Sequence, residues 1–244
     1  MNSGIYSTVS GSLAAMRRLD IISNNLANVN TAGFKKDKMS FEGLLAGATN
    51  PPAVPQGSTA DPILQKENLY IDYSNGPITQ TGNPLDLAID GDGFFAVATP
   101  DGIAYTRQGN LRLSADGTLV TSDGYAVQGQ GGSIRIQGNR IEIDAKGVVS
   151  VDGTPTGSIS LVDFDKPYNL TKIGSTLFVP ADQQEPRQSV AAQISQGHLE
   201  GSNVESISEM VQMIETNRYF EACSKVIKSF DDIAAKAASE LGRV

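Results

Sequence analysis

The C-terminal part of the chain limits the possible folds more than any other feature of the sequence. No glycine or proline occurs between Asn203 and Leu241. These two residue types are the ones that most often interrupt helices, so the stretch can form one helix of nearly forty residues. Helices in globular domains average only about 12 residues. We therefore expect this helix to extend beyond a single compact core and to pack against other helices.

The N-terminal segment also has helical spacing. Apolar residues recur every three or four positions from Ile5 to Leu26, which places them on one face of a helix. Asn28, Asn30 and Gly33 then predict the end of this helix.

The C-terminal helix is expected to begin near Ser202 or Asn203, either of which can cap it, with Glu205 in the first turn. From Phe220 to Leu241 its apolar residues alternate between steps of three and four, the pattern of a heptad seam. A lone helix with such a seam is marginal in water, so each seam needs a partner.

Two arrangements bury these seams. Either the terminal helices pair with each other or with copies from other chains and become ordered on assembly, or they form a private two-helix bundle beside the rest of the protein. Gly11, inside the N-terminal helix, indicates a close approach of a neighbouring helix or a tolerated weak position. The residues predicted to form an assembly interface are Ile5, Val9, Leu13, Met16, Asn24, Asn25, Leu26, Asn28, Ile207, Met210, Val211, Ile214, Phe220, Ile227 and Phe230.

Between the ends the apolar period changes from helical to two. Ten short β-type runs occupy 85–89, 94–99, 103–107, 118–121, 125–128, 134–136, 141–143, 148–151, 159–164 and 176–179. Asp-Gly pairs, which accept the positive φ angles of tight hairpin turns, begin at positions 90, 92, 101, 116, 123 and 152. The sequence therefore predicts an α+β protein in which terminal, coiled-coil-forming helices flank an all-β domain, a hairpin-rich open barrel or sandwich.

Four regions follow from these patterns. We expect an N-terminal helix with its end signals over 1–45, a linker and loop over 46–76, a β-rich domain over 77–201 and the long helix over 202–244. The proline-rich stretch 46–62 is the clearest linker sequence.

Composition argues against several classes of protein. A net charge of −8 disfavours nucleic acid as a partner, and no apolar run approaches the ~18 residues of a membrane span. The N-terminus lacks the pattern of a cleaved secretory signal. The single cysteine, Cys223, excludes an intrachain disulfide and fits the apolar seam better than a reactive site.

Catalytic and ligand-binding patterns are weak. The single histidine, His198, would have to serve any Ser-His-Asp triad, and with one histidine and one cysteine a zinc site of several such ligands cannot form. The stretch 90–93 resembles the start of a calcium loop, but Phe94 stands where an acidic or amide ligand is needed and Asp101 stands where the loop needs glutamate. The glycine-rich stretch 129–132 lacks the end of a phosphate loop. We expect no enzyme activity, cofactor, metal or small-molecule substrate.

Several blocks of sequence resemble the bacterial flagellar rod and hook protein family. They are Asn24–Lys35 (NNLANVNTAGFK), the stretches 81–95, 105–110 and 118–125, and the C-terminal block from Ser202 to Ile227. The chain is shorter than hook proteins usually are, and its β insert is larger than those of the two short proximal-rod proteins. Its length and ending favour another proximal-rod member, with a distal-rod member as the alternative.

The resemblance implies a structural subunit of a helical tube, the drive shaft that passes torque from the motor to the hook. It implies terminal helices in the inner layer, an outward β domain, and contacts with copies of the chain and with other rod proteins. It also implies passage through the flagellar export apparatus without a cleaved signal peptide, and a final location in the basal-body rod across the periplasm. Asn24, Asn25 and Asn28 then either fix subunit register by hydrogen bonds or cap the helix and shape its turn. A β domain that binds sugars or acts on the cell wall is the alternative of another class.

Overall fold

The computed structural model describes residues 2–43, 65–138, 140–181, 184–189 and 192–241. The chain forms two compact units. Unit 1 contains Met1–Ala27, Asp37–Asp72 and Glu205–Val244, and unit 2 contains Asn28–Lys36 and Tyr73–Val204. The linker sequence over 46–62 lies outside the described residues.

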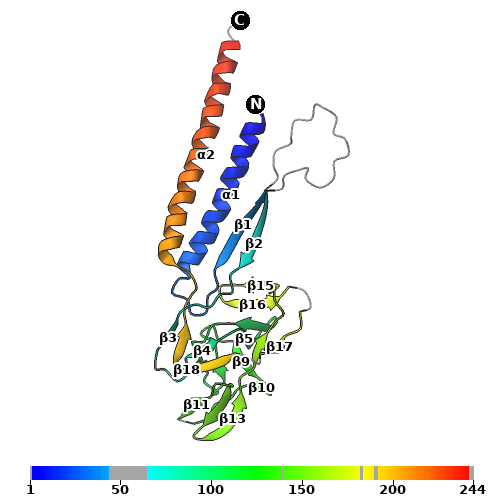
Figure 1. The fold of residues 1–244 in the computed structure, drawn as a ribbon, viewed down its shortest axis with the longest axis vertical. Helices are drawn as coiled ribbons and strands as arrows, with labels where there is room; N and C mark the ends of the chain where they lie inside the picture. Colours follow the sequence, from blue (N-terminus) through cyan, green and yellow to red (C-terminus); the bar gives the residue numbers. More distant parts are fainter. Residues whose placement is uncertain (1, 44–64, 139, 182–183, 190–191, 242–244) are drawn as a thin grey trace. The chain divides into compact units, whose positions relative to one another are not determined.

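Unit 1 contains the two long helices, α1 (Asn2–Ala27) and α2 (Ser206–Leu241). They lie side by side and run in opposite directions (Figure 1). Within the described residues, neither helix has an apolar stretch long enough to cross a bilayer. The predicted end of the N-terminal helix is confirmed, because α1 ends at Ala27.

The predicted cap of the C-terminal helix is wrong, because α2 begins only at Ser206. The Ser202 hydroxyl accepts a hydrogen bond from the amide of Val204 over 3.2 Å, and Asn203 Oδ1 accepts one from the amide of Lys36 over 2.8 Å. Both side chains therefore bind backbone outside the helix. The first helical bond runs instead from the amide of Glu209 to the carbonyl of residue 205, over 3.0 Å.

Unit 1 also contains a two-stranded antiparallel hairpin of β1 (Asp37–Gly43) and β2 (Gln65–Ile71). Its register pairs Asp37 with Ile71 and Gly43 with Gln65. Strand β2 occupies part of the stretch expected to be a linker and loop.

Unit 2 is built from short strands. Its largest sheet has ten strands, with β15-β16-β6-β5-β9-β8-β7 as the main path, β10 beside β9, and β14 between β5 and β17. The strands of this sheet are β5 (Phe94–Thr99), β6 (Gly102–Thr106), β7 (Arg112–Leu113), β8 (Leu119–Val120), β9 (Ala126–Gly129), β10 (Gly132–Ser133), β14 (Leu161–Asp163), β15 (Leu170–Ile173), β16 (Leu177–Pro180) and β17 (Arg187–Gln188).

Three smaller sheets complete the unit. One has the order β11-β12-β13, the second pairs β18 with β4, and the third pairs β19 with β3. Their strands are β3 (Ile78–Gln80), β4 (Leu87–Asp90), β11 (Ile141–Ile143), β12 (Val148–Val151), β13 (Thr154–Ser158), β18 (Gln193–Gln196) and β19 (His198–Glu200).

The Asp-Gly pairs behave largely as predicted. Every glycine of the six pairs has a positive φ angle. The pairs that begin at 101, 116, 123 and 152 lie between β5 and β6, β7 and β8, β8 and β9, and β12 and β13, each an antiparallel pair. The pairs at 90 and 92 lie between β4 and β5, which belong to different sheets among the described strands.

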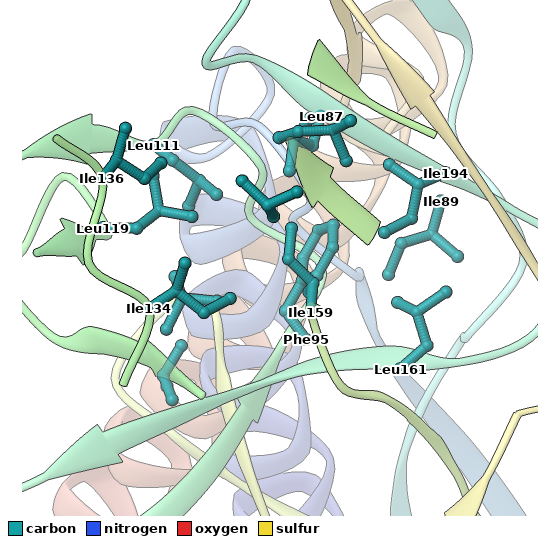
Figure 2. Close-up of a cluster of buried hydrophobic side chains, with 14 of the residues drawn as sticks. Leu87, Ile89, Phe95, Leu111, Leu119, Ile134, Ile136, Ile159, Leu161 and Ile194 are labelled. Carbon is teal, nitrogen blue, oxygen red and sulfur yellow. The ribbon is translucent and has the colours of Figure 1, made fainter. Parts of the chain in front are cut away.

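The core of unit 2 is aliphatic. Leu87, Phe95, Val97, Leu119 and Val127 are among its fully buried members. Figure 2 shows side chains from many of the short strands and the segments between them meeting in this cluster. The described strands close no barrel, and the predicted α+β class, with helices at both ends of a β-rich middle, is confirmed.

Candidate assembly surface

The first half of α1 exposes a row of large apolar side chains. Tyr6 is 67% exposed, and Val9, Leu13 and Met16 are each about half exposed. They follow one another at steps of three or four residues and therefore form one stripe along the helix. This stripe is part of the face that the apolar spacing identified in the sequence.

Helix α2 exposes a similar stripe. Ile207 is 78% exposed, Ile214 is 55% exposed, and Met210 and Val211 are each about half exposed. Tyr219, Val226 and Ile233 are also exposed farther along the helix. Scattered apolar residues are normal on a protein surface, but contiguous apolar stripes mark interaction sites.

Small and polar residues make much of the contact between α1 and α2. Ala14, Ala15 and Ile22 are the buried apolar residues of α1, and Thr216 and Cys223 are buried on α2. A Cβ added at Gly11 would lie 2.7 Å from the Tyr219 hydroxyl and 3.8 Å from Cys223 Sγ. Gly11 therefore marks a close approach of the two helices of one chain, which is one of the two interpretations its sequence position allowed.

A shallow hollow of about 430 Å³ lies along this helix pair. Its lining residues are Gly11, Ala14, Ala15, Arg18, Glu215, Thr216 and Tyr219. Arg18 Nη2 donates to Gln212 Oε1 over 3.4 Å beside it. The hollow therefore lies beside the contact between α1 and α2, and of its lining residues only Tyr219 is also one of the exposed large apolar side chains.

The predicted interface residues fall into three groups. The exposed ones are Val9, Leu13, Met16, Asn24, Ile207, Met210, Val211 and Ile214, and the half-buried ones are Ile5, Leu26, Asn28, Phe220, Ile227 and Phe230. Asn25 is buried, with 2% of its surface exposed. All except Asn28 lie in unit 1.

Asn25 and Asn28 bind within the chain. The side chain of Asn25 exchanges two hydrogen bonds with the backbone of Asp37 and reaches Glu209 Oε2 over 3.4 Å. Asn28 accepts from the Thr31 hydroxyl over 3.2 Å and from the Thr31 amide over 3.1 Å. Asn28 thus shapes the turn after α1, and Asn25 makes its hydrogen bonds inside unit 1; a role of either residue in subunit contacts stays a prediction.

The two residues considered for catalysis, Cys223 and His198, both contact neighbouring residues within the fold. Cys223 is buried on α2, and its hydrogen bond with Tyr219 raises the pKa of that tyrosine. His198 lies in β19, where its Nδ1 is 2.9 Å from the carbonyl oxygen of Gln196. Among the described residues, no group of histidine, cysteine and acidic side chains has the arrangement of a metal site.

One cluster of charged residues was not foreseen from the sequence. Lys35, Arg107 and Glu200 are each at most 2% exposed, and Lys35 and Arg107 each form an ion pair with Glu200 inside unit 2. They are distant in the chain, so no local spacing indicates that they meet. Gly33, which the sequence marked only as part of the helix end, lies against this cluster: it has a positive φ of 68°, and its close approach to the backbone of Arg107 leaves no room for a side chain.

Comparison with known proteins gives a consistent family. A family model of the flagellar hook protein FlgE/F/G D1 domain matches residues 88–151. A model of the C-terminal part of flagellar basal body rod FlgEFG proteins matches residues 195–240, and a model of flagella basal body rod proteins matches residues 5–35.

Full-length relatives agree with these matches. The flagellar basal-body rod protein FlgG of Bacillus subtilis is 38% identical over 254 residues, covering 94% of this chain and 95% of the relative. FlgF of Caulobacter vibrioides is 32% identical over 247 residues, covering 100% of both chains. FlgF of Mesorhizobium japonicum is 32% identical over 248 residues, covering 99% of both. The chain therefore belongs to the flagellar basal-body rod protein family, near FlgF and FlgG, as a structural rod subunit and not an enzyme.

Proposed function

We propose that this chain is a proximal-rod subunit whose helices α1 and α2 contact the helices of neighbouring subunits through their exposed apolar stripes. The single observation that carries the proposal is the exposure of these stripes on both helices, with Ile207 at 78%. Removal of apolar surface from water contributes about 25 cal/mol per Å², so covering both stripes favours association.

The geometry of such contacts favours a tube. The stripes of α1 and α2 carry different residues, so a contact between one stripe and a neighbour's other stripe is heterologous. Heterologous contacts that do not close into a ring generate open helical assemblies. Partners of this kind are copies of the chain and other rod proteins, and a stiff tube made of them would transmit torque from the motor to the hook.

The proximal position is supported by the end-to-end alignment with FlgF proteins, which covers 99–100% of both chains in three relatives. The distal position is the alternative, supported by the 38% identity to FlgG of B. subtilis. Cryo-electron microscopy of purified basal bodies at side-chain resolution distinguishes the two. Density for this chain next to the membrane ring is expected, and density only next to the hook would contradict the proximal assignment.

Self-association tests the stripes directly. In sedimentation velocity at rising concentration, the full-length chain should form polymers, and a Leu13→Asp, Ile214→Asp variant should remain monomeric. Both residues are about half exposed, so the variant should keep its helical circular dichroism. Ile103→Asp in β6 is the matched control, because Ile103 is 57% exposed but lies outside the helices. Polymers of the helix variant equal to those of the wild type would refute the role of the stripes.

We further propose that the subunit reaches the periplasmic rod through the flagellar export apparatus without cleavage of a signal peptide. Mass spectrometry of the protein from purified basal bodies tests this. We expect the whole of α1 to be present, and a mature N-terminus inside α1 would contradict the proposal.

A further inference from the structure

The buried charged cluster of unit 2 has one carboxylate between two cations. Lys35 Nζ lies 2.6 Å from Glu200 Oε1, and Arg107 Nη1 lies 3.2 Å from Glu200 Oε2. The side chains of Lys35 and Glu200 are each 1% exposed, and that of Arg107 is 2% exposed. Each of these charged side chains loses hydration worth several kcal/mol when it is buried. The ion pairs therefore stabilise the folded state only by the small difference between their attraction and this loss of hydration.

The other donors of the cluster are mostly satisfied by backbone. Lys35 Nζ also donates to the Ser74 carbonyl over 2.8 Å, and Arg107 Nη2 donates to the Gly91 carbonyl over 2.7 Å. The amide of Gly76 donates to Glu200 Oε1 over 3.0 Å. Arg107 Nε is buried and has no hydrogen-bond partner in the described part of the chain. The closed cluster therefore contains a donor that would gain a partner if water entered.

The cluster lies where the chain enters and leaves unit 2. The chain passes to the other unit after Lys36, returns before Tyr73, and leaves again after Val204. These crossings belong to three segments, 28–36, 73–77 and 198–204, which together with Arg107 we call the clasp.

Hydrogen bonds tie the three segments of the clasp to one another. The amide of Gly33 donates to the carbonyl of Glu200 over 2.8 Å, and the amide of Gly201 donates to the carbonyl of Pro77 over 2.8 Å. Asn203 joins all three, because its Oδ1 accepts from the amide of Lys36 and its Nδ2 donates to the Ser74 carbonyl over 3.1 Å.

Phe34 adds apolar and cation–π stabilisation to the closed clasp, beside the ring contacts of Tyr73 with Phe94 and Phe178. Phe34 is fully buried, and Lys172 Nζ lies 3.9 Å from the centre of its ring. Lys172 also donates to the carbonyl of Lys35 over 2.8 Å. Opening the clasp exposes this ring to water. The free-energy cost of that exposure opposes the free energy gained when the three charged side chains are hydrated again.

The clasp does not share the aliphatic core. That buried cluster includes residues from Leu87 to Ile194, and none of its described members belongs to 28–36, 73–77 or 198–204 (Figure 2). We infer that the clasp opens and closes as a cooperative unit of its own while the core stays folded, and that Glu200 holds it closed. Closure fixes, and opening frees, the three segments through which the chain enters and leaves unit 2. This inference does not depend on the proposed function.

Native-state hydrogen exchange of the full-length protein in increasing urea tests the inference. The clasp amides are those of Gly33, Lys36, Gly76, Gly201 and Asn203, and the core amides for comparison are those of Leu119, Ile136 and Ile159. The clasp amides should exchange through one common opening, at least about tenfold more often than the core amides and with a smaller urea dependence. Equal rates and equal urea dependence in the two groups, or unrelated rates within the clasp, would overturn the inference.

Glu200→Gln tests the role of the carboxylate. Leaving the other members of a buried ion pair without a counter-charge costs several kcal/mol, so the clasp amides should exchange about a hundredfold faster or more. The core amides should stay within about threefold of wild type. Glu142→Gln is the matched control, because Glu142 pairs with Arg140 over 2.7 Å but is 54% exposed. Unchanged clasp amides, or core amides accelerated as much as the clasp, would contradict the proposal, and the wild-type urea series tests it whether or not this variant folds.

Discussion

The side-chain amide of Asn25 pairs with the backbone of Asp37 in the way that one β-strand pairs with another. Asn25 Oδ1 accepts from the amide of Asp37 over 3.0 Å, and Asn25 Nδ2 donates to the carbonyl of the same residue over 2.9 Å. Asn25 lies in the last turn of α1, and Asp37 is the first residue of β1. This pair of hydrogen bonds joins the helix to the hairpin within unit 1.

Asn25→Ala should destabilise unit 1 by about 2 kcal/mol, because it leaves both backbone groups of Asp37 without their partner. Urea unfolding of the full-length protein followed by helical circular dichroism measures the loss. Asn217→Ala makes the same chemical change at an exposed position inside α2, where alanine is the better helix former, and should not destabilise the protein. Equal effects of the two substitutions would refute the role of Asn25.

Gly11 and Tyr219 should be energetically coupled. Gly11→Ala gains about 1 kcal/mol of helix propensity, but the new methyl group displaces the Tyr219 hydroxyl and disturbs its hydrogen bond with Cys223. We therefore expect no net gain in the wild type and a gain of about 1 kcal/mol in a Tyr219→Phe background. A double-mutant cycle from thermal unfolding measures the coupling.

Gly4→Ala is the control for this cycle. Its added methyl group would meet Phe230 at 3.5 Å, an ordinary van der Waals distance, so its effect should be the same in both backgrounds. A Gly11→Ala effect that is equally independent of Tyr219 would show that the hydroxyl does not limit the approach of the two helices.

Substitutions at Gly33 and Gly82 distinguish the cost of the backbone conformation from the cost of steric overlap. Both have positive φ angles, 68° and 74°, but a Cβ at Gly33 would overlap the backbone of Arg107, whereas one at Gly82 would meet nothing within 4 Å. Gly82→Ala should cost about 1 kcal/mol for the left-handed conformation alone. Gly33→Ala should cost about 3 kcal/mol because overpacking adds to it. Urea unfolding of both variants measures the difference, and equal costs would exclude the steric explanation.

Local chemistry explains which parts of the fold were predictable. The Asp-Gly pair at 101 predicts the turn of the β5–β6 hairpin because these two residues determine the backbone conformation of the turn locally. The hairpin β1–β2 was not predicted. Its strands read DKMSFEG and QKENLYI, in which charged residues obscure any alternation, and they pair across a long stretch of sequence.

Helical periodicity identified the apolar stripes but not what they contact. The spacing from Ile5 to Leu26 is real, yet Leu13 in this stripe is half exposed, while Ala14 and Ala15 beside it are buried. Small side chains allow the closest approach between α1 and α2, and an apolar scale gives them little weight. The Lys35–Glu200 pair was not predictable for a different reason, because 165 residues separate its members and only the tertiary fold brings them together.

Unit 2 should lose stability as the pH rises above about 10. Burial, and a hydrogen bond donated to Asp163 over 2.9 Å, raise the pKa of Tyr168 above that of a free tyrosine, and burial raises the pKa of Tyr105. In this range the unfolded chain releases protons that the folded chain retains, so unfolding becomes more favourable as the pH increases; below pH 10 the two states bind these protons equally. Tyr168→Phe should make the alkaline loss of stability shallower, and Tyr105→Phe should remove a second contribution. Urea unfolding at pH 7, 9, 10 and 11 measures the slopes, and a slope unchanged by both substitutions would show that these tyrosines do not control the alkaline limit of the fold.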